Sequence, residues 1–384
     1  MDAAFTPDSR LPDVGVTVFT VMSRLAGEHG AINLSQGFPD FDCAPELVAL
    51  VREWLGRARN QYAPMAGVPE LRQALARAID ERYGARYDPD TEITVTAGAT
   101  EALFSAVTAL VHPGDEVVIV EPCYDSYVPA VKLAGGVPVF VTLRAPDYAV
   151  DWDEVARALT PKTRLLLLNS PHNPTGMVLG ADDLARLASL LDGSRVVVLG
   201  DEVYEHLVFD GRRHESLSRH PALAARSAVV SSFGKSFHTT GWKVGYVTAP
   251  AAITAEIQRV HQFVTFAVNT PVQLAYAEFL DRGIDVGEVA RFYQAKRDRF
   301  LALLEGSRFR PLACRGTYFQ ILDYSAISGG KDVDVAMDVL KKYGVASIPT
   351  SAFLYASEAP RVLRFCFAKK DETLEAAAER LRRI

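Results

Sequence analysis

The 384-residue sequence has only four cysteines, Cys43, Cys123, Cys314 and Cys366, and no two of them form a C-x-x-C pair. Four scattered thiols are too few for a disulfide scaffold, and their spacing disfavours a zinc site. We therefore interpret them as reduced side chains that fill space. No run approaches the ~20 consecutive apolar residues of a membrane span. The first residues lack the basic start and apolar core of a signal peptide. We therefore expect a cytoplasmic protein with no membrane partner.

Basic residues are also fewer than acidic residues. Lysine and arginine number 41 against 47 acidic residues, for a net charge of −6, which disfavours a nucleic-acid partner. Three catalytic signatures are missing as well. Without H-E-x-x-H, G-x-S-x-G or G-x-G-x-x-G, the chain does not resemble a zinc hydrolase, an α/β-hydrolase or a Rossmann dinucleotide enzyme. With 49% hydrophobic and 23% charged residues, the composition is that of a globular protein.

The middle of the chain alternates short apolar runs with longer helical patterns. The runs are apolar on both faces, which is typical of parallel strands covered by helices on each side. This alternation predicts a doubly wound α/β domain. We predict strands at 92–96, 116–120, 164–168, 195–199, 228–231 and 244–247, and helices at 100–111 and 181–191.

The last hundred residues have a different pattern, which predicts a smaller α+β domain. A long helical stretch covers 271–304, and strand-like runs follow at 316–322 and 362–367. Gly344 supplies a helix stop, and Asp371 is a candidate N-cap for the final helix. We predict a large domain over 46–275 and a small domain made of 1–45 and 276–384.

Unusual polar groups follow four of the predicted strands, at 98–100, 169–176, 201–204 and 231–235. In an open parallel sheet, ligands bind beyond the carboxyl ends of the strands. One site there would combine a phosphate cradle, a hydrogen-bond donor, a carboxylate, a phenol and an amine. That set fits a phosphorylated, nitrogen-containing aromatic cofactor better than a metal or a bare nucleotide.

Each of these groups also has a plainer interpretation. The Gly98-Ala99-Thr100 segment is either an ordinary βα turn or a helix N-terminus that binds phosphate. Asp201 is either a helix N-cap or the partner of a buried cation, for which we suggest a protonated pyridine nitrogen. Tyr204 lies three residues further on, within reach of the same ligand.

Three basic residues stand out. Only ten residues are lysines, and Lys235 lies in the small, apolar context SSFGKSF. A lysine held there loses its proton more easily and attacks a carbonyl group, although a surface lysine is the alternative. Lys243 is either a surface lysine or a point charge for phosphate. Arg364 in LRFCF either faces solvent or holds a carboxylate through its planar guanidinium.

Taken together and in this order, the residues resemble a fold-type I, class I or II aminotransferase that uses pyridoxal 5'-phosphate (PLP). The resemblance covers essentially the whole chain and is nearest to the kynurenine aminotransferase-like subgroup, within it to bacterial methionine aminotransferases. Its finer signatures are LSQGFPDF, NQYAPMAGVPELR, TVTAGATEALF, GDEVYEH, SSFGKSFHTTGWKVGY and LRFCFAKK. It implies the fold-type I architecture, with a large doubly wound, mostly parallel-sheet domain and a small α+β domain.

The resemblance also implies a role for each site residue. Lys235 would bond to the cofactor and then move the proton. Asp201 would pair with the pyridine nitrogen, and Tyr124 would stack on the ring. Arg364 would bind the substrate carboxylate, and Phe19 would line the pocket for the substrate side chain. The remaining implied contacts are Asn173 and Tyr204 at the phenolic oxygen, Gly98, Ala99, Thr100, Ser232 and Lys243 at the phosphate, and Asn173 and Gly37 at the carboxylate.

The resemblance further implies a homodimer in which Tyr62 reaches the phosphate of the partner subunit. The expected reaction moves the amino group of an apolar, sulfur-containing or aromatic amino acid, such as methionine, phenylalanine, tyrosine or kynurenine, to a 2-oxo acid by a ping-pong mechanism. Aspartate is not expected, since no obvious arginine lies around 260–271 to hold its side chain. The alternative is a cysteine-S-conjugate β-lyase on the same scaffold.

Overall fold

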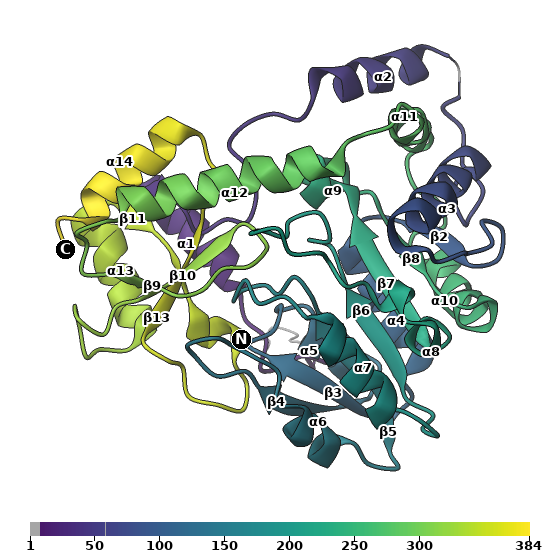
Figure 1. The fold of residues 1–384 in the computed structure, drawn as a ribbon, viewed down its shortest axis with the longest axis horizontal. Coiled ribbons are helices and arrows are strands. Elements are labelled where there is room, and N and C mark those ends of the chain that lie inside the picture. The colour runs from purple at the N-terminus through teal and green to yellow at the C-terminus, as the bar shows by residue number, and fades with distance from the viewer. Residues whose placement is uncertain (1–7, 58) are drawn as a thin grey trace, which may run out of the picture.

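The computed structural model describes residues 8–57 and 59–384. A seven-stranded sheet forms the centre of its larger part (Figure 1). The strands lie in the order β2-β8-β7-β6-β5-β3-β4, and β8 is antiparallel to both of its neighbours while the other pairs are parallel. The predicted α/β class is therefore confirmed. The strands are β2 (Ile93–Thr96), β3 (Glu116–Glu121), β4 (Val137–Thr142), β5 (Thr163–Asn169), β6 (Val197–Asp201), β7 (Ser227–Ser232) and β8 (Gly245–Thr248).

Both faces of this sheet are covered because its central strands are apolar on both sides. In β3, Val117 and Ile119 belong to one buried cluster, whereas Val118 and Val120 belong to another. Successive side chains of a strand point to opposite faces, so each strand feeds two cores. The first cluster includes side chains of α4 (Ala99–Leu110), α5 (Tyr127–Leu133) and α10 (Ala251–Val264); the second includes α6 (Trp152–Ala158), α7 (Ala181–Leu190) and α8 (Pro221–Ala224).

The two edges of the sheet differ. The edge strand β4 was not predicted, and it contains Pro138, a residue that weakens a strand pattern and is tolerated mainly at sheet edges. At the opposite edge, helices pack beside β2 and β8 in a third buried cluster. These helices are α2 (Pro45–Gly56), α3 (Pro69–Tyr83), α9 (Phe233–Ser236) and α11 (Thr270–Asp281).

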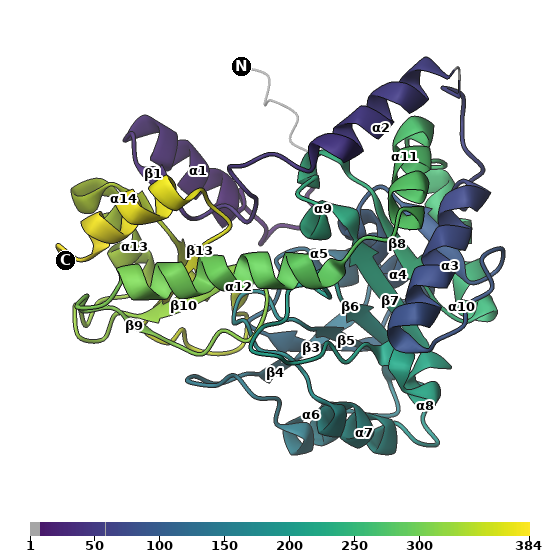
Figure 2. The ribbon, with the colours of Figure 1, turned by 45° about the horizontal axis from the view of Figure 1, so that its top comes forward.

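The first and last parts of the chain form most of a fourth buried cluster, away from the large sheet (Figures 1 and 2). The four-stranded antiparallel sheet β12-β13-β10-β9 lies beside a parallel pair formed by β1 and β11. The strands are β1 (Ile32–Asn33), β9 (Arg310–Pro311), β10 (Phe319–Asp323), β11 (Val345–Ala346), β12 (Ile348–Pro349) and β13 (Val362–Cys366). The helices are α1 (Val18–Glu28), α12 (Val286–Leu303), α13 (Asp332–Tyr343) and α14 (Asp371–Leu381), with Gly344 in the left-handed conformation at the end of α13.

Two local predictions were wrong. The helical stretch over 271–304 is two helices, because Gly283 adopts a positive φ of 76° and Asp285 begins α12 by accepting a hydrogen bond from the Gly287 amide. Asp371 is the first residue of α14 and not its N-cap, which is Lys370. Its carboxylate instead accepts a hydrogen bond from the Lys296 amine at 2.6 Å, an ion pair between distant segments.

The division into a large domain over 46–275 and a small domain stays a prediction, and residues 1–7 of its N-terminal segment lie outside the described residues. All four cysteines are free thiols. No helix among the described residues is long and apolar enough to cross a membrane. Within the same residues, no group of three or more His, Cys, Asp or Glu side chains could hold a metal ion.

Candidate active site

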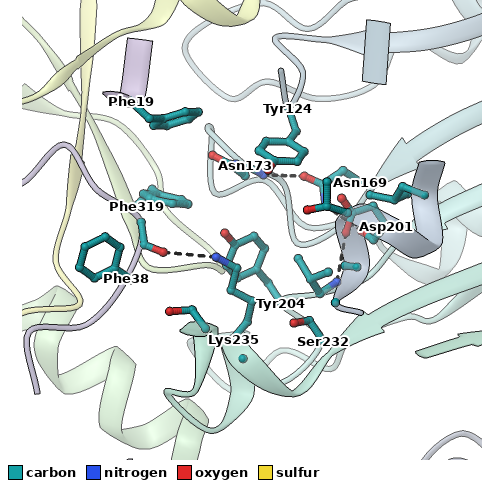
Figure 3. A pocket seen from close by; sticks show the side chains of 18 of the residues that line it. Phe19, Phe38, Tyr124, Asn169, Asn173, Asp201, Tyr204, Ser232, Lys235 and Phe319 are labelled. Atoms are coloured by element: carbon teal, nitrogen blue, oxygen red, sulfur yellow. Dashed lines mark hydrogen bonds between the residues drawn. The ribbon is translucent and has the colours of Figure 1, made fainter. Parts of the chain in front are cut away.

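A cavity of about 310 Å³ lies beyond the carboxyl ends of β5, β6 and β7. Every predicted site residue except Tyr62 lines it. Figure 3 shows two sides around Lys235: Asn169, Asp201 and Ser232 lie on one side, and the rings of Phe19, Phe38 and Phe319 lie on the other. We call the polar side the strand-end half, made of Gly98, Ala99, Thr100, Asn169, Asp201 and Ser232. We call the aromatic side the remote half, made of Phe19, Gly37, Phe38, Phe319 and Arg364.

Lys235 lies between the two halves. It belongs to the short helix α9, which follows β7 directly, so the end of that strand places it in the cavity. Its Nζ donates to the Tyr318 hydroxyl at 3.0 Å and to the Gly37 carbonyl oxygen at 3.3 Å. Burial lowers the pKa of the Lys235 amine to about 8, because the charged form loses its hydration. The amine is therefore partly deprotonated near neutral pH.

Asp201 ends β6 and is buried under the cavity. Its Oδ2 accepts a hydrogen bond from the Tyr127 hydroxyl at 2.5 Å, and its Oδ1 accepts one from the Val203 amide at 3.4 Å. Both donors are neutral, and burial raises the pKa of the Asp201 carboxyl to about 6. A cation beside this carboxylate would restore its charge. The Asp201 carboxylate thus fits a protonated ring nitrogen as its partner, and its position needs no N-cap role to explain it.

Arg364 is fully buried on β13, and its planar guanidinium reaches across to the loop after β5. Its Nη1 donates to the Asn173 side-chain oxygen at 2.8 Å, and Nη2 donates to the Ser35 carbonyl at 2.9 Å. The main-chain amide of Asn173 in turn donates to Oδ1 of Asn169 at 2.7 Å, so the loop is held at the end of the strand that it follows. The solvent-facing alternative for Arg364 is therefore wrong.

Aromatic rings surround this guanidinium. Its central carbon lies 3.9 Å from the ring centre of Phe319, 5.1 Å from that of Phe19 and 5.2 Å from that of Phe353. Burial lowers the pKa of Arg364 to about 10. Its Nε has no hydrogen-bond partner, and no acidic side chain forms an ion pair with it among the described residues. A buried cation with an orphaned donor beside apolar rings fits a ligand that carries both a carboxylate and an apolar group.

A cluster of hydrogen-bond donors fits a phosphate at the other end of the cavity. Gly98 precedes α4 with a φ of 79°, and no side chain caps the N-terminus of that helix. A Cβ at Gly98 would lie 3.2 Å from Lys243 Nζ, and one at Gly245 would lie 2.9 Å from the Ala99 amide. Free amides and an ammonium group therefore meet at one point, near Ser232, which is the arrangement that binds phosphate.

The two tyrosines predicted for the cofactor ring also line the cavity. Burial raises the pKa of Tyr204 and that of Tyr124. Both phenols therefore stay protonated at neutral pH and are able to donate a hydrogen bond. Figure 3 shows the Tyr124 ring on the same side of the cavity as Asn169 and Asp201.

Tyr62 is the exception among the predicted residues. It is 85% exposed and does not line the cavity. Its ring packs edge to face on Phe266, with centroids 5.4 Å apart, and Phe263 and Val264 are exposed nearby in sequence. These four side chains, Tyr62, Phe263, Val264 and Phe266, form what we call the exposed aromatic patch.

Several residues that touch the site were not predicted from the sequence. Phe38, Gln36 and Phe319 line the cavity, while Tyr127 and Tyr318 bond to Asp201 and Lys235. None of them follows an apolar strand as an isolated polar group, which is the pattern that revealed Asp201 and Lys235.

The comparisons with known proteins agree with this geometry. A sequence model of the family described as "Aminotransferase class I and II" matches residues 29–381. The chain is 49% identical to a methionine aminotransferase of Escherichia coli over 98% of each chain, and an E. coli crystal structure described as having that function superposes with a TM-score of 0.97, covering 99% of this chain and 100% of that one.

Other relatives have different substrates in their names. The structure of N-succinyldiaminopimelate aminotransferase from Mycobacterium tuberculosis is 41% identical, with a TM-score of 0.95, and covers 98% of this chain and 99% of that one. A mouse kynurenine–oxoglutarate transaminase is 36% identical over 97% of this chain and 96% of its own.

Proposed function

Because the chain belongs to the class I and II aminotransferases, we propose that it transfers the amino group of an apolar, sulfur-containing or aromatic L-amino acid to a 2-oxo acid in two half-reactions. One observation carries the proposal. The buried Arg364 guanidinium lies on Phe319, within the same cavity as the Lys235 amine. Arg364 would bind a carboxylate and Phe319 an apolar side chain, while the Lys235 amine would serve as the base that moves the proton at Cα.

Enzymes of this family depend on PLP and act on amino acids and 2-oxo acids. The strand-end half and other residues that line the cavity have suitable partners for each part of that cofactor. Asp201 would hold the ring nitrogen, Asn173 and Tyr204 the phenolic oxygen, and Tyr124 the ring face. Gly98, Ala99, Thr100, Ser232 and Lys243 would hold the phosphate. When bound, PLP supplies an aldehyde carbon that takes the amino group and a ring that delocalises the electron pair left at Cα.

The chain itself supplies orientation and proton transfer. Arg364, together with Asn173 and the Gly37 main chain, would bind the α-carboxylate, which fixes where Cα lies. Lys235 Nζ would then remove the proton from Cα. It would deliver that proton to the carbon on the other side of the transferred nitrogen, which is the former aldehyde carbon of the cofactor. Its pKa of about 8 suits this task, since a base works best when its pKa is near the working pH. Phe19 and Phe319 would cover the substrate side chain.

The polarity of the cavity and the names of the relatives support the substrate class. Among the described residues that line the cavity, Arg364 is the only arginine, so none remains there for a second carboxylate. Aromatic rings occupy the remote half. Methionine and kynurenine appear in the names of two of the relatives above. N-succinyldiaminopimelate, named for another, carries extra carboxylates and is the competing substrate to test.

Two structural proposals accompany this function: a large domain over 46–275 with the remaining residues in a small domain, and a homodimer. In the dimer, the exposed aromatic patch would be buried and Tyr62 would reach the phosphate of the partner subunit. The exposure of Tyr62 at 85% and of Phe263 at 86%, and the contact of Tyr62 with Phe266, support the burial. Light scattering should give twice the chain mass, and Phe263→Asp should weaken association; a monomer at micromolar concentration that retains full activity would contradict it.

The function is tested with the purified protein, PLP and a panel of donors. Methionine and phenylalanine should convert the cofactor absorbance to that of its amine form, and a 2-oxo acid should restore it. Faster conversion by aspartate or N-succinyldiaminopimelate would contradict the substrate class. Pyruvate and ammonia formed from a cysteine S-conjugate without any 2-oxo acid would instead indicate a β-lyase.

A further inference from the structure

The hydroxyl of Tyr318 bridges the Lys235 amine and the main chain of the remote half. Tyr318 precedes β10 and is fully buried. Its Oη donates to the Gly37 carbonyl at 2.5 Å, which leaves the oxygen lone pairs free to accept from Lys235 Nζ at 3.0 Å. Lys235 also donates to the same Gly37 oxygen at 3.3 Å. One phenol and one carbonyl together thus hold the amine.

The surroundings keep this phenol in place. Its ring meets Tyr204 edge to face, with centroids 5.2 Å apart, and packs on Tyr293 at 5.6 Å. Burial keeps the pKa of Tyr318 well above its usual range, so the group is a neutral hydroxyl. It accepts a hydrogen bond from the lysine and carries no negative charge that would hold the lysine proton.

We propose that Tyr318 is a positioning residue for the catalytic lysine: with the Gly37 carbonyl it forms a dock that receives the Lys235 amine whenever that amine is not bonded to the cofactor. The proposal rests on the proposed function. During transfer, the substrate nitrogen replaces the lysine nitrogen on the aldehyde carbon of the cofactor. The lysine then leaves as a free amine with the two hydrogens that the substrate nitrogen gave up. A long, flexible side chain released in this way needs a fixed position from which to move the proton at Cα.

The dock also couples the amine to the carboxylate site. Gly37 lies in the segment that includes Ser35, whose carbonyl accepts from Arg364. The same short segment therefore bonds to the base and to the residue proposed to hold the substrate. Other charged or titratable groups near Lys235 are Tyr204, whose ring centre lies 5.8 Å from Nζ, and Asp201, Arg364, Lys243 and the Cys366 thiol. All of them remain in the variants below, so their effects cancel in the comparison.

The experiment removes one hydroxyl at a time from neighbouring tyrosines. Tyr318→Phe deletes the acceptor, whereas Tyr293→Phe is the matched control, because Tyr293 is also buried and its hydroxyl has no partner among the described residues. The full chain is freed of cofactor, and the rate at which it bonds PLP is followed by absorbance from pH 6 to 10. This rate reports the deprotonated Lys235 amine and requires no turnover.

The lost hydrogen bond stabilises the ammonium form, so Tyr318→Phe should lower the midpoint of the rate profile by about one pH unit. The single-turnover rate of Tyr318→Phe with methionine should be about tenfold lower than that of the wild type, with little change in KM. The isotope effect, measured with methionine deuterated at Cα, should be larger in the variant than in the wild type. Tyr293→Phe should match the wild type, and both variants should melt cooperatively. A Tyr318→Phe profile and isotope effect equal to those of the wild type would overturn the inference alone. A wild type that neither bonds PLP nor transaminates would overturn the proposed function itself.

Discussion

The strand-end half of the cavity comes from consecutive strand ends of one sheet, whereas the remote half is assembled from segments far apart in the chain. Asn169, Asp201 and Ser232 each close a neighbouring parallel strand. Phe19, Gly37 and Arg364 come from the first forty residues and the last β-strand of the chain. The contrast teaches that the first half follows from local sequence and sheet geometry, and the second from the packing of one part of the protein against another.

The largest expected effect is at the boundary of the two halves. Lys235→Ala removes the base and the covalent attachment, so turnover should fall by at least about 10³-fold. The cofactor would still be held by the strand-end half, so binding of PLP should weaken far less than turnover. Steady-state kinetics and equilibrium dialysis separate the two effects. Lys162→Ala, at an exposed position, is the control; a Lys235→Ala enzyme with more than a tenth of wild-type turnover would contradict the role of the lysine.

The strand-end half should also show a pH-dependent stability. Burial raises the pKa of Asp201 to about 6, above its unfolded value near 3.8. This group therefore stabilises the fold below about pH 4, and that contribution is lost as the pH rises through 6. In the cofactor-free chain the loss should be about 3 kcal/mol by pH 7, and PLP should offset it. Urea unfolding of the wild type and Asp201→Asn at several pH values measures the difference, which should grow with pH; parallel curves would contradict it.

In the remote half, Arg364→Gln should act on the substrate and spare the cofactor. The variant loses the charge that is proposed to bind the α-carboxylate, so KM for methionine should rise about 100-fold. PLP binding should change little, since Asp201, Ser232 and Lys243 remain. Arg52→Gln, an exposed substitution, is the control. If Arg364→Gln lowered PLP affinity as much as it raised KM, the separation between the two halves would be wrong.

The sequence predicts these halves unequally for physical reasons. Asp201 and Lys235 were found because a polar side chain at the end of an apolar strand is costly to bury without a purpose. The roles of Phe19 and Arg364 came only with the family resemblance, since an arginine in an apolar strand has two possible environments and spacing does not choose between them. Tyr318 and Phe319 gave no pattern at all, because their significance lies in contacts with Lys235 and Arg364 across the cavity.

The architecture shows a similar limit. Burial on both faces leaves a strong apolar pattern, so β5 was predicted to within one residue at each end, and β6 was found but placed two residues too early. The edge strand β4 was missed, since Pro138 interrupts its pattern and one side of it lacks a neighbour among the described strands. The turn at Gly283 was missed because the apolar spacing continues through it into α12.

The smallest expected effect sharpens the comparison, because it concerns a residue of the large sheet that serves the remote half. Glu121 ends β3, is fully buried, and accepts hydrogen bonds from the Tyr355 amide at 2.7 Å, the Ala356 amide at 3.2 Å and the Ser357 hydroxyl at 2.9 Å. Two residues later, the Cys123 amide donates to the Phe353 carbonyl at 2.8 Å. The end of β3 therefore fixes the segment that places Phe353 beside Arg364.

Glu121→Gln keeps the shape of the side chain and removes its charge, so the segment should loosen without leaving its place. KM for phenylalanine should rise about tenfold while kcat and PLP affinity stay near wild type, and amide hydrogen exchange should quicken at 353–357. Glu116→Gln is the matched control, since Glu116 begins the same strand at its opposite end. Equal exchange and equal KM in the two variants would mean that the remote half is held without the sheet, and that the two halves are built independently.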